Sequence, residues 1–132
     1  MILKCFVKDF HIVSLQAIYR LENGEVRTGL LYGSRDLKGC ECQEIFLGNE
    51  DESMNTFYVN FDKEKGLSYI EIDSEIYGSQ SAGYQYYSYD HLFYVIKIKS
   101  PFLKYFRVQY NFKKIYWLGF DRNLRENAEK WE

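Results

Sequence analysis

The feature that most constrains the fold of this chain is a series of short runs in which apolar and polar residues alternate. One run covers Val13–Leu21 and a second covers Val26–Tyr32. Because successive side chains of a strand point to opposite faces of a sheet, this period of two predicts β-strands. The Asn23-Gly24 dipeptide between the runs predicts a tight hairpin turn. A helix over Phe10–Glu22, capped by Gly24, is the competing interpretation.

The rest of the chain repeats this pattern, which predicts seven to nine strands. The further strands are expected at Ile2–Val7, Cys40–Leu47, Thr56–Phe61, Leu67–Ile72, His91–Lys99, Phe106–Phe112 and Ile115–Phe120. The tail differs, because Leu124, Ala128 and Trp131 follow a helical spacing and predict a short C-terminal helix at about residues 122–131. We therefore expect one mainly β (α+β) globular domain over residues 1–132. Its architecture should be a bent antiparallel sheet, a sandwich or a partly open barrel.

The ends and the cysteines of the chain indicate a cytoplasmic protein. Charged residues interrupt the first nine positions too early for a signal peptide, and no stretch approaches the ~20 apolar residues of a membrane helix. Three cysteines, an odd number, favour reduced thiols. Cys40-Glu41-Cys42 is the one close pair, and a zinc site would need His11 and His91 to converge on it. We therefore expect no metal and no cofactor.

Catalytic motifs are absent from the sequence. His11 and His91 are the two imidazoles, and neither lies in a known nucleophile or metal motif. We therefore expect no catalytic residues. A small enzyme whose site assembles from distant residues is an alternative that the sequence leaves open.

Charge is divided unevenly along a chain whose net charge is only −2. The segment Glu41–Glu75 holds ten acids and two bases, whereas Lys97–Phe120 holds six bases and no acid. The two segments either pair across the sheet, at ~0.2–1 kcal/mol per pair, or form separate charged surfaces. In the second case Glu50, Asp51 and Glu52 are the centre of an exposed acidic loop that would bind a basic partner.

A tyrosine-rich segment, residues 77–90, is the most unusual part of the composition. It combines tyrosine with serine, glycine and glutamine and holds one charge, a mixture typical of antibody binding loops. We predict that Tyr84, Tyr86, Tyr87 and Tyr89 lie on an exposed loop and contact a partner. The alternative is an aromatic ladder across neighbouring strands.

The segment 97–117 supports a second function, binding of single-stranded nucleic acid. Its six bases are interleaved with aromatic residues, so that nucleotide bases could stack while cations follow the phosphates. Against this, Phe106, Val108, Tyr110 and Phe112 alternate like the core face of a strand, and the chain is acidic overall.

The favoured interpretation is a non-enzymatic protein-binding module. In size, mild acidity, aromatic content and lack of catalytic residues, the chain resembles the small immunity or inhibitor proteins of bacteria and phages. That resemblance implies that it neutralises a toxin or an enzyme by covering the active site. The partner would be another protein with a basic surface, bound by the acidic loop and anchored by the tyrosines. No membrane contact is expected, and the oligomeric state is left open.

Overall fold

Eleven strands make up the regular structure of the computed structural model, which describes residues 2–21, 23–46, 54–75, 77–86, 91–99, 106–120 and 128–131. The four strands β1 (Ile2–Lys8), β2 (His11–Arg20), β3 (Val26–Gly33) and β4 (Glu41–Phe46) form one sheet in the order β3-β2-β1-β4. β5 (Met54–Asp62), β6 (Gly66–Ser74), β7 (Gly78–Gly83), β8 (His91–Lys99) and β11 (Ala128–Trp131) form a second sheet in the order β11-β8-β5-β6-β7. β9 (Phe106–Tyr110) and β10 (Ile115–Phe120) form a separate hairpin.

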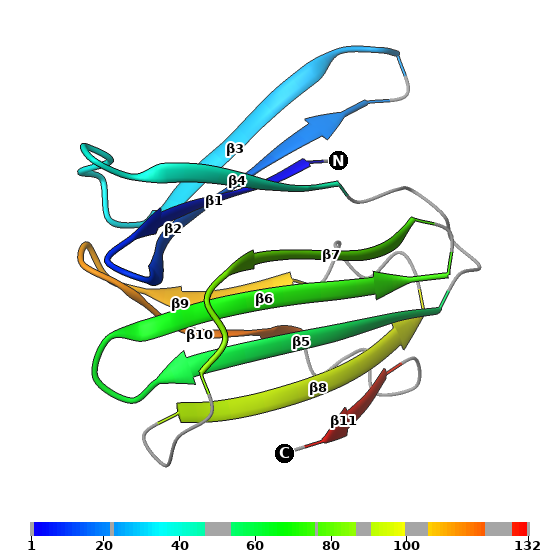
Figure 1. The fold of residues 1–132 in the computed structure, drawn as a ribbon. Helices are drawn as coiled ribbons and strands as arrows, with labels where there is room; N and C mark the ends of the chain where they lie inside the picture. Colours follow the sequence, from blue (N-terminus) through cyan, green and yellow to red (C-terminus); the bar gives the residue numbers. More distant parts are fainter. Residues whose placement is uncertain are drawn as a thin grey trace.

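Every strand pair in the described residues is antiparallel, which confirms the mainly β prediction. Each sheet order has two free ends, so none of the three sheets closes into a barrel. The four-stranded and five-stranded sheets lie one above the other, with the β9–β10 hairpin beside them (Figure 1). Among the described residues there is no helix that could cross a membrane.

The core forms between the sheets from the side chains that alternation turns inward. Phe57, Val59 and Phe61 of β5 are all buried, as their spacing predicts. They join inward residues of the other strands in one cluster: Leu3, Cys5, Val7, Ile12, Leu15, Ile45, Leu67, Ile70, Ile72, Ala82 and Ile115. Because this cluster draws on all three sheets, burial of apolar surface stabilises their packing together.

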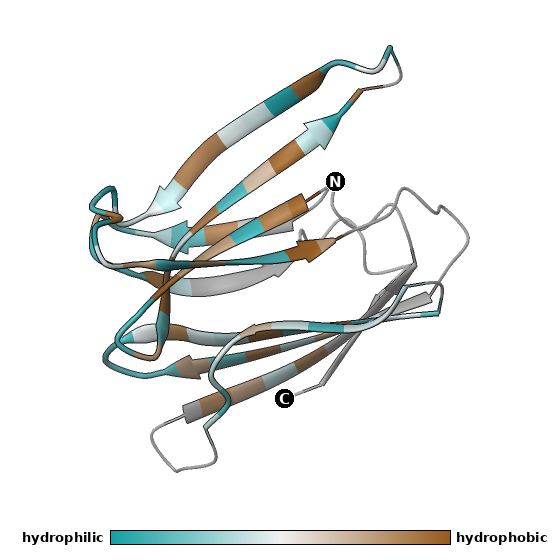
Figure 2. Cartoon of the chain, turned by 45° about the horizontal axis from the view of Figure 1, so that its top comes forward, coloured by the Kyte–Doolittle hydropathy of each residue, from teal (hydrophilic) through white to brown (hydrophobic). Residues whose placement is uncertain are grey.

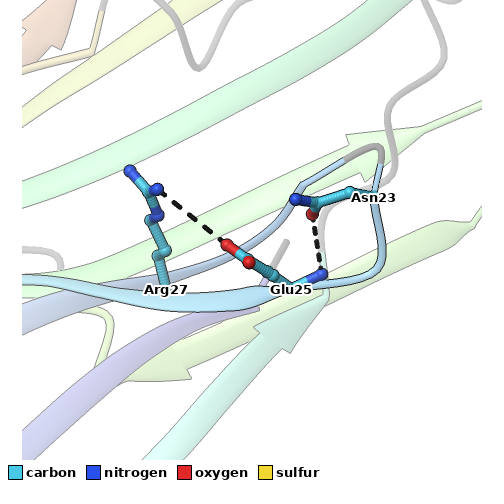
Figure 3. A network of polar contacts seen from close by, with 3 residues as sticks. All are labelled: Asn23, Glu25 and Arg27. Carbon is cyan, nitrogen blue, oxygen red and sulfur yellow. Dashed lines mark hydrogen bonds and ion pairs between the residues drawn. The ribbon is translucent and has the colours of Figure 1, made fainter.

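The predicted hairpin between β2 and β3 is confirmed, with residues 21–25 rather than a two-residue turn between the strands, and the competing helix over Phe10–Glu22 is wrong. Gly24 has a φ of 86° and its N–H donates to Leu21 O at 2.9 Å. The Asn23 side chain accepts the Glu25 N–H at 3.0 Å, and Glu25 lies 3.9 Å from Arg27 (Figure 3). Figure 2 shows this hairpin extending away from the rest of the structure with apolar bands along both strands.

The two large sheets are joined at their edges by glutamine side chains. The Gln80 amide bonds both backbone groups of Phe46: it accepts from Phe46 N at 2.8 Å and donates to Phe46 O at 2.6 Å. Gly83 N donates to the side chain of Gln43 at 2.8 Å. Gln80 therefore satisfies the edge of β4 in the way a neighbouring strand would.

Three sequence expectations need correction. The helix predicted at about residues 122–131 is not confirmed: Ala128–Trp131 is a strand paired with β8, and residues 121–127 lie outside the described part. The expected loop over residues 77–90 is in part strand β7. Val108 packs against the core as expected, but Tyr110, the last residue of β9, is exposed. Phe112 is also exposed, because it lies in the turn after β9 has ended.

The acidic and basic segments are neighbours in the fold. β5, from the acidic segment, pairs with β8, and the turn that follows β5 contacts the β9–β10 turn. This places the two segments side by side, as the pairing interpretation requires.

Candidate functional site

The turn between β1 and β2 carries the most unusual backbone of the structure. Lys8 pairs with His11, so only Asp9 and Phe10 connect the strands. Their φ angles are 50° and 64°, the pair of positive values that a two-residue hairpin turn requires. Such turns favour Asn-Gly, and a bulky residue in this region costs about 1–2 kcal/mol. Phe10 nevertheless occupies it with 60% of its surface exposed.

The tyrosine strap, which we define as residues 84–86, crosses from the five-stranded sheet toward this turn. Figure 1 shows the chain leaving β7 and running across β6 and β5 in the direction of β8. Tyr84 N donates to Ser68 O at 2.7 Å, and Tyr86 N donates to Asn60 Oδ1 at 2.9 Å. Asn60 and Ser68 are fully buried, so the backbone of the strap is fixed to the interior.

Gly83 makes the change of direction into the strap possible. Its φ is 84°, and a Cβ at this position would lie 2.1 Å from Ser68 O. Any other residue would therefore push the strap away from the β6 backbone.

Two aromatic contacts join the strap to the β1–β2 turn. The rings of Phe10 and Tyr84 meet edge to face with centroids 4.9 Å apart, and Tyr86 stacks on His11 at 5.9 Å. The Tyr86 hydroxyl also donates to Phe10 O at 3.4 Å. We call these four residues, Phe10, His11, Tyr84 and Tyr86, the aromatic turn site. Tyr84 is 40% exposed and Tyr86 is half-buried, so the site presents rings to solvent on a supported base.

His11 supplies the buried polar atom of this site. Only 7% of the residue is exposed, and its Nδ1 lies 2.8 Å from Asp9 O. A carbonyl can only accept, so Nδ1 is the donor of this bond. Nε2 is buried and has no hydrogen-bond partner among the residues that the structure describes.

The structure places only part of the predicted binding surface. Tyr84 and Tyr86 lie in the strap, whereas Tyr87, Tyr89, Glu50, Asp51 and Glu52 lie outside the described residues.

Two sets of residues are predicted to bind a partner, one acidic and one of tyrosines. The described residues next to each set lie at opposite ends of β7. Phe46, the last described residue before the acidic residues 50–52, contacts Tyr77 with ring centroids 5.3 Å apart, just before β7 starts. The strap follows the other end of that strand. Six residues of strand separate these points, a distance of about 20 Å.

Phe10 and His11 are the residues that the sequence pattern could not assign to this site. Their turn contains neither glycine nor asparagine, so it carries no hairpin signal. A bulky residue at positive φ becomes visible only in the backbone geometry.

The outer face of the five-stranded sheet carries an acidic pair, Glu71 and Asp73. Tyr69 Oη donates to Glu71 Oε1 at 2.5 Å. Burial raises the pKa of the Glu71 carboxyl, the Tyr69 bond opposes that rise, and Asp73 adds to it. The pKa of the nearby Tyr58 hydroxyl is raised by burial and then by Asp73.

The cysteines do not form a cluster with other potential metal ligands. Cys5 is buried, Cys40 is half-buried and Cys42 is exposed, and all three thiols are free. Within the described ranges, no three histidine, cysteine or acidic side chains are grouped closely enough to hold a metal ion.

Comparison of this chain with known proteins finds no relative. No protein-family model, no curated protein and no solved structure matches the chain.

Proposed function

We propose that this protein is a non-enzymatic binding module of the immunity or inhibitor type, which neutralises a toxin or an enzyme by covering its active site. The observation that carries the proposal is Phe10, an exposed phenylalanine at positive φ that contacts the exposed ring of Tyr84. A positive φ at a bulky residue costs stability, and residues strained in this way concentrate at binding sites.

The support beneath the rings suits them to act as anchors. The strap is held by Asn60 and Ser68, and Tyr86 stacks on the buried His11. Because these contacts already order the site in the free protein, a partner would lose little conformational entropy on binding. Large aromatic residues in such positions account for much of the binding energy of protein interfaces.

The proposed partner is a protein with a basic surface. Tyr87 and Tyr89 would extend the aromatic turn site, and Glu50, Asp51 and Glu52 would add the charge that selects a basic active site. We place the protein in the cytoplasm, which agrees with its three free thiols.

The test is Phe10→Gly, which removes the exposed ring and relieves the backbone strain in one change. We expect the free energy of unfolding to change by less than about 1 kcal/mol, because relief of the positive φ offsets the lost ring contact with Tyr84. Binding of a partner captured from the source cells should weaken about 30-fold, the effect of losing a residue worth about 2 kcal/mol. The captured protein is then purified and its activity measured with and without this chain.

Leu30→Ser is the matched control, because Leu30 is also an exposed apolar residue but lies on the projecting β2–β3 hairpin. It should bind the partner like the wild type. Equal binding by the Phe10→Gly variant, or a captured protein whose activity is unaffected by this chain, would contradict the proposal.

A further inference from the structure

Two turns that are far apart in the sequence lie together at one end of the structure. The β5–β6 turn (residues 62–65) and the β9–β10 turn (residues 111–114) are joined by Lys114 Nζ, which donates to Glu64 O at 2.5 Å. A Cβ on Gly66 would lie 2.3 Å from Ile115 O, so the backbones approach closely beside this bond. Figure 1 shows both turns at the same end of the strands. We call them the paired turns.

Each of the paired turns is fixed by one polar side chain. Asp62 Oδ1 accepts the N–H groups of Glu64 and Lys65 at 2.8 and 2.9 Å. Asn111 Oδ1 accepts those of Lys113 and Lys114 at 2.8 and 2.9 Å. The turns therefore hold their shape without help from a partner.

The paired turns gather positive charge that the linear sequence separates. Lys63, Lys65 and Lys113 are exposed and Lys114 is half-buried. The Asp62 carboxylate is bonded to two backbone N–H groups, which offset part of its charge, and Glu64 is the other acid of the two turns. Lys63 and Lys65 are the two bases of the otherwise acidic segment Glu41–Glu75, so only the fold brings them to the basic segment.

An exposed aromatic residue lies in the middle of this charge. Phe112 is 74% exposed, and the Lys113 ammonium lies 5.8 Å from the centre of its ring. Tyr116 and Tyr110, the aromatic residues that flank the turn, are also exposed. Phe112 contributes nothing to the core from this position, so its ring is free to stack on a flat ligand.

We propose that the paired turns bind single-stranded nucleic acid, with the lysines on phosphates and Phe112 stacked on a base. Cations beside a solvent-exposed aromatic face are the combination that recognises unpaired nucleotides, because stacking needs bases that are not already stacked in a duplex. The proposal uses other side chains than those of the aromatic turn site, so this inference does not rest on the proposed function.

The experiment measures binding of a fluorescent oligothymidine of about 12 nucleotides by anisotropy at several salt concentrations. Phe112→Ala should weaken binding at least about 5-fold, the lower limit for loss of one stacked base. The double variant Lys63→Ala/Lys113→Ala should weaken binding and reduce the slope of log K against log salt by about 1.4, because each phosphate contact on a single strand contributes ~0.7.

Two controls make the result specific. Arg20→Ala/Arg27→Ala removes the same charge from the β2–β3 hairpin and should leave the salt slope unchanged. Phe10→Gly should bind the oligonucleotide like the wild type. The inference is overturned if the wild type shows no salt-dependent binding, or if the arginine variant loses as much affinity as the lysine variant. It is also overturned if the paired-turn variants lose a captured protein but not the oligonucleotide.

Discussion

Asn60 fixes the strap of the aromatic turn site to the five-stranded sheet, so replacing it tests how the strap is held. The residue is fully buried on β5. Its Oδ1 accepts from Tyr86 N at 2.9 Å, and its Nδ2 donates to Leu92 O at 3.1 Å. An amide N–H can only donate and a carbonyl can only accept, so these two partners fix the orientation of the Asn60 amide.

Asn60→Ala should destabilise the protein by about 2–3 kcal/mol. The variant leaves the Tyr86 N–H and the Leu92 carbonyl without this partner, at ~1–3 kcal/mol for each buried group. The bonds to the Tyr86 N–H and the Leu92 carbonyl are only partly buried, so the summed cost of leaving both groups unpaired falls toward the lower end of this range. The Ser68 hydroxyl loses less, because it also donates to the Asn60 backbone carbonyl at 3.0 Å, which the variant keeps.

Asn60→Asp separates loss of the hydrogen bonds from loss of packing. A carboxylate cannot donate to Leu92 O, whereas a protonated carboxyl can, so the folded-state pKa of the introduced carboxyl should lie above the ordinary ~3.9 of an aspartate. A group whose pKa is raised by folding stabilises the folded protein at a pH below its unfolded-state pKa, and this stabilisation is lost as the pH rises through the folded-state pKa. The free energy of unfolding of Asn60→Asp should therefore be close to that of the wild type at about pH 4 and much lower than that of the wild type at about pH 7.

The measurement is urea unfolding followed by tryptophan fluorescence, combined with hydrogen exchange at the Tyr86 amide. Asn60→Ala should speed that exchange, and a double-mutant cycle with Ser68→Ala should give a coupling of at least about 0.5 kcal/mol. An Asn60→Ala variant within ~0.5 kcal/mol of the wild type, or an Asn60→Asp variant whose stability does not depend on pH, would show that the Asn60 side chain does not hold the strap.

Two further predictions concern the titrating groups. Burial and then Asp73 raise the pKa of the Glu71 carboxyl, so the folded protein favours its protonated form and loses stability as the pH rises. The free energy of unfolding of Glu71→Gln should therefore equal that of the wild type at acidic pH and exceed it near neutrality. The difference should be less than ~1 kcal/mol, because this group is partly solvated. A constant difference across the pH range in urea unfolding would contradict this. Burial raises the pKa of the Cys5 thiol, so an alkylating reagent should modify exposed Cys42 in the native protein and Cys5 only after unfolding. Mass spectrometry measures the rate at which each thiol is modified, and equal rates for Cys5 and Cys42 would show that Cys5 is accessible.

The strands that the sequence predicted are those whose side chains carry the alternation. In β5, Phe57, Val59 and Phe61 enter the core at every second position. β7 was missed because Gly78–Gly83 contains no branched or aromatic residue. Its stability comes from backbone pairing with β6 and from the side-chain bonds of Gln80 and Gln43, which depend on neighbours in space.

The C-terminal helix is not confirmed, for a related reason. Ala128 and Trp131 fit a helical stripe with Leu124, but in the structure Ala128–Trp131 extends the sheet by pairing with β8. Pairing with an existing edge satisfies the backbone groups of both strands, and it overrides a weak local preference for helix.

The candidate site was predictable only in its composition. Tyr84 and Tyr86 were identified because tyrosine, serine and glycine together are typical of binding loops. Their contacts with Phe10 and His11 join residues more than 70 positions apart, for example Tyr86 and Phe10 at a separation of 76. No local pattern records such a contact.

The way this chain builds its turns explains why Phe10 is informative. The β5–β6 and β9–β10 turns each have an Asp or Asn side chain that bonds two backbone N–H groups, and the β2–β3 turn has Gly24 at positive φ. These residues make the turns favourable on local grounds. The Asp9-Phe10 turn instead places a bulky exposed ring where glycine would be more stable. Within the protein the ring packs against Tyr84 yet stays 60% exposed, and this exposed part is what we propose a partner protein contacts.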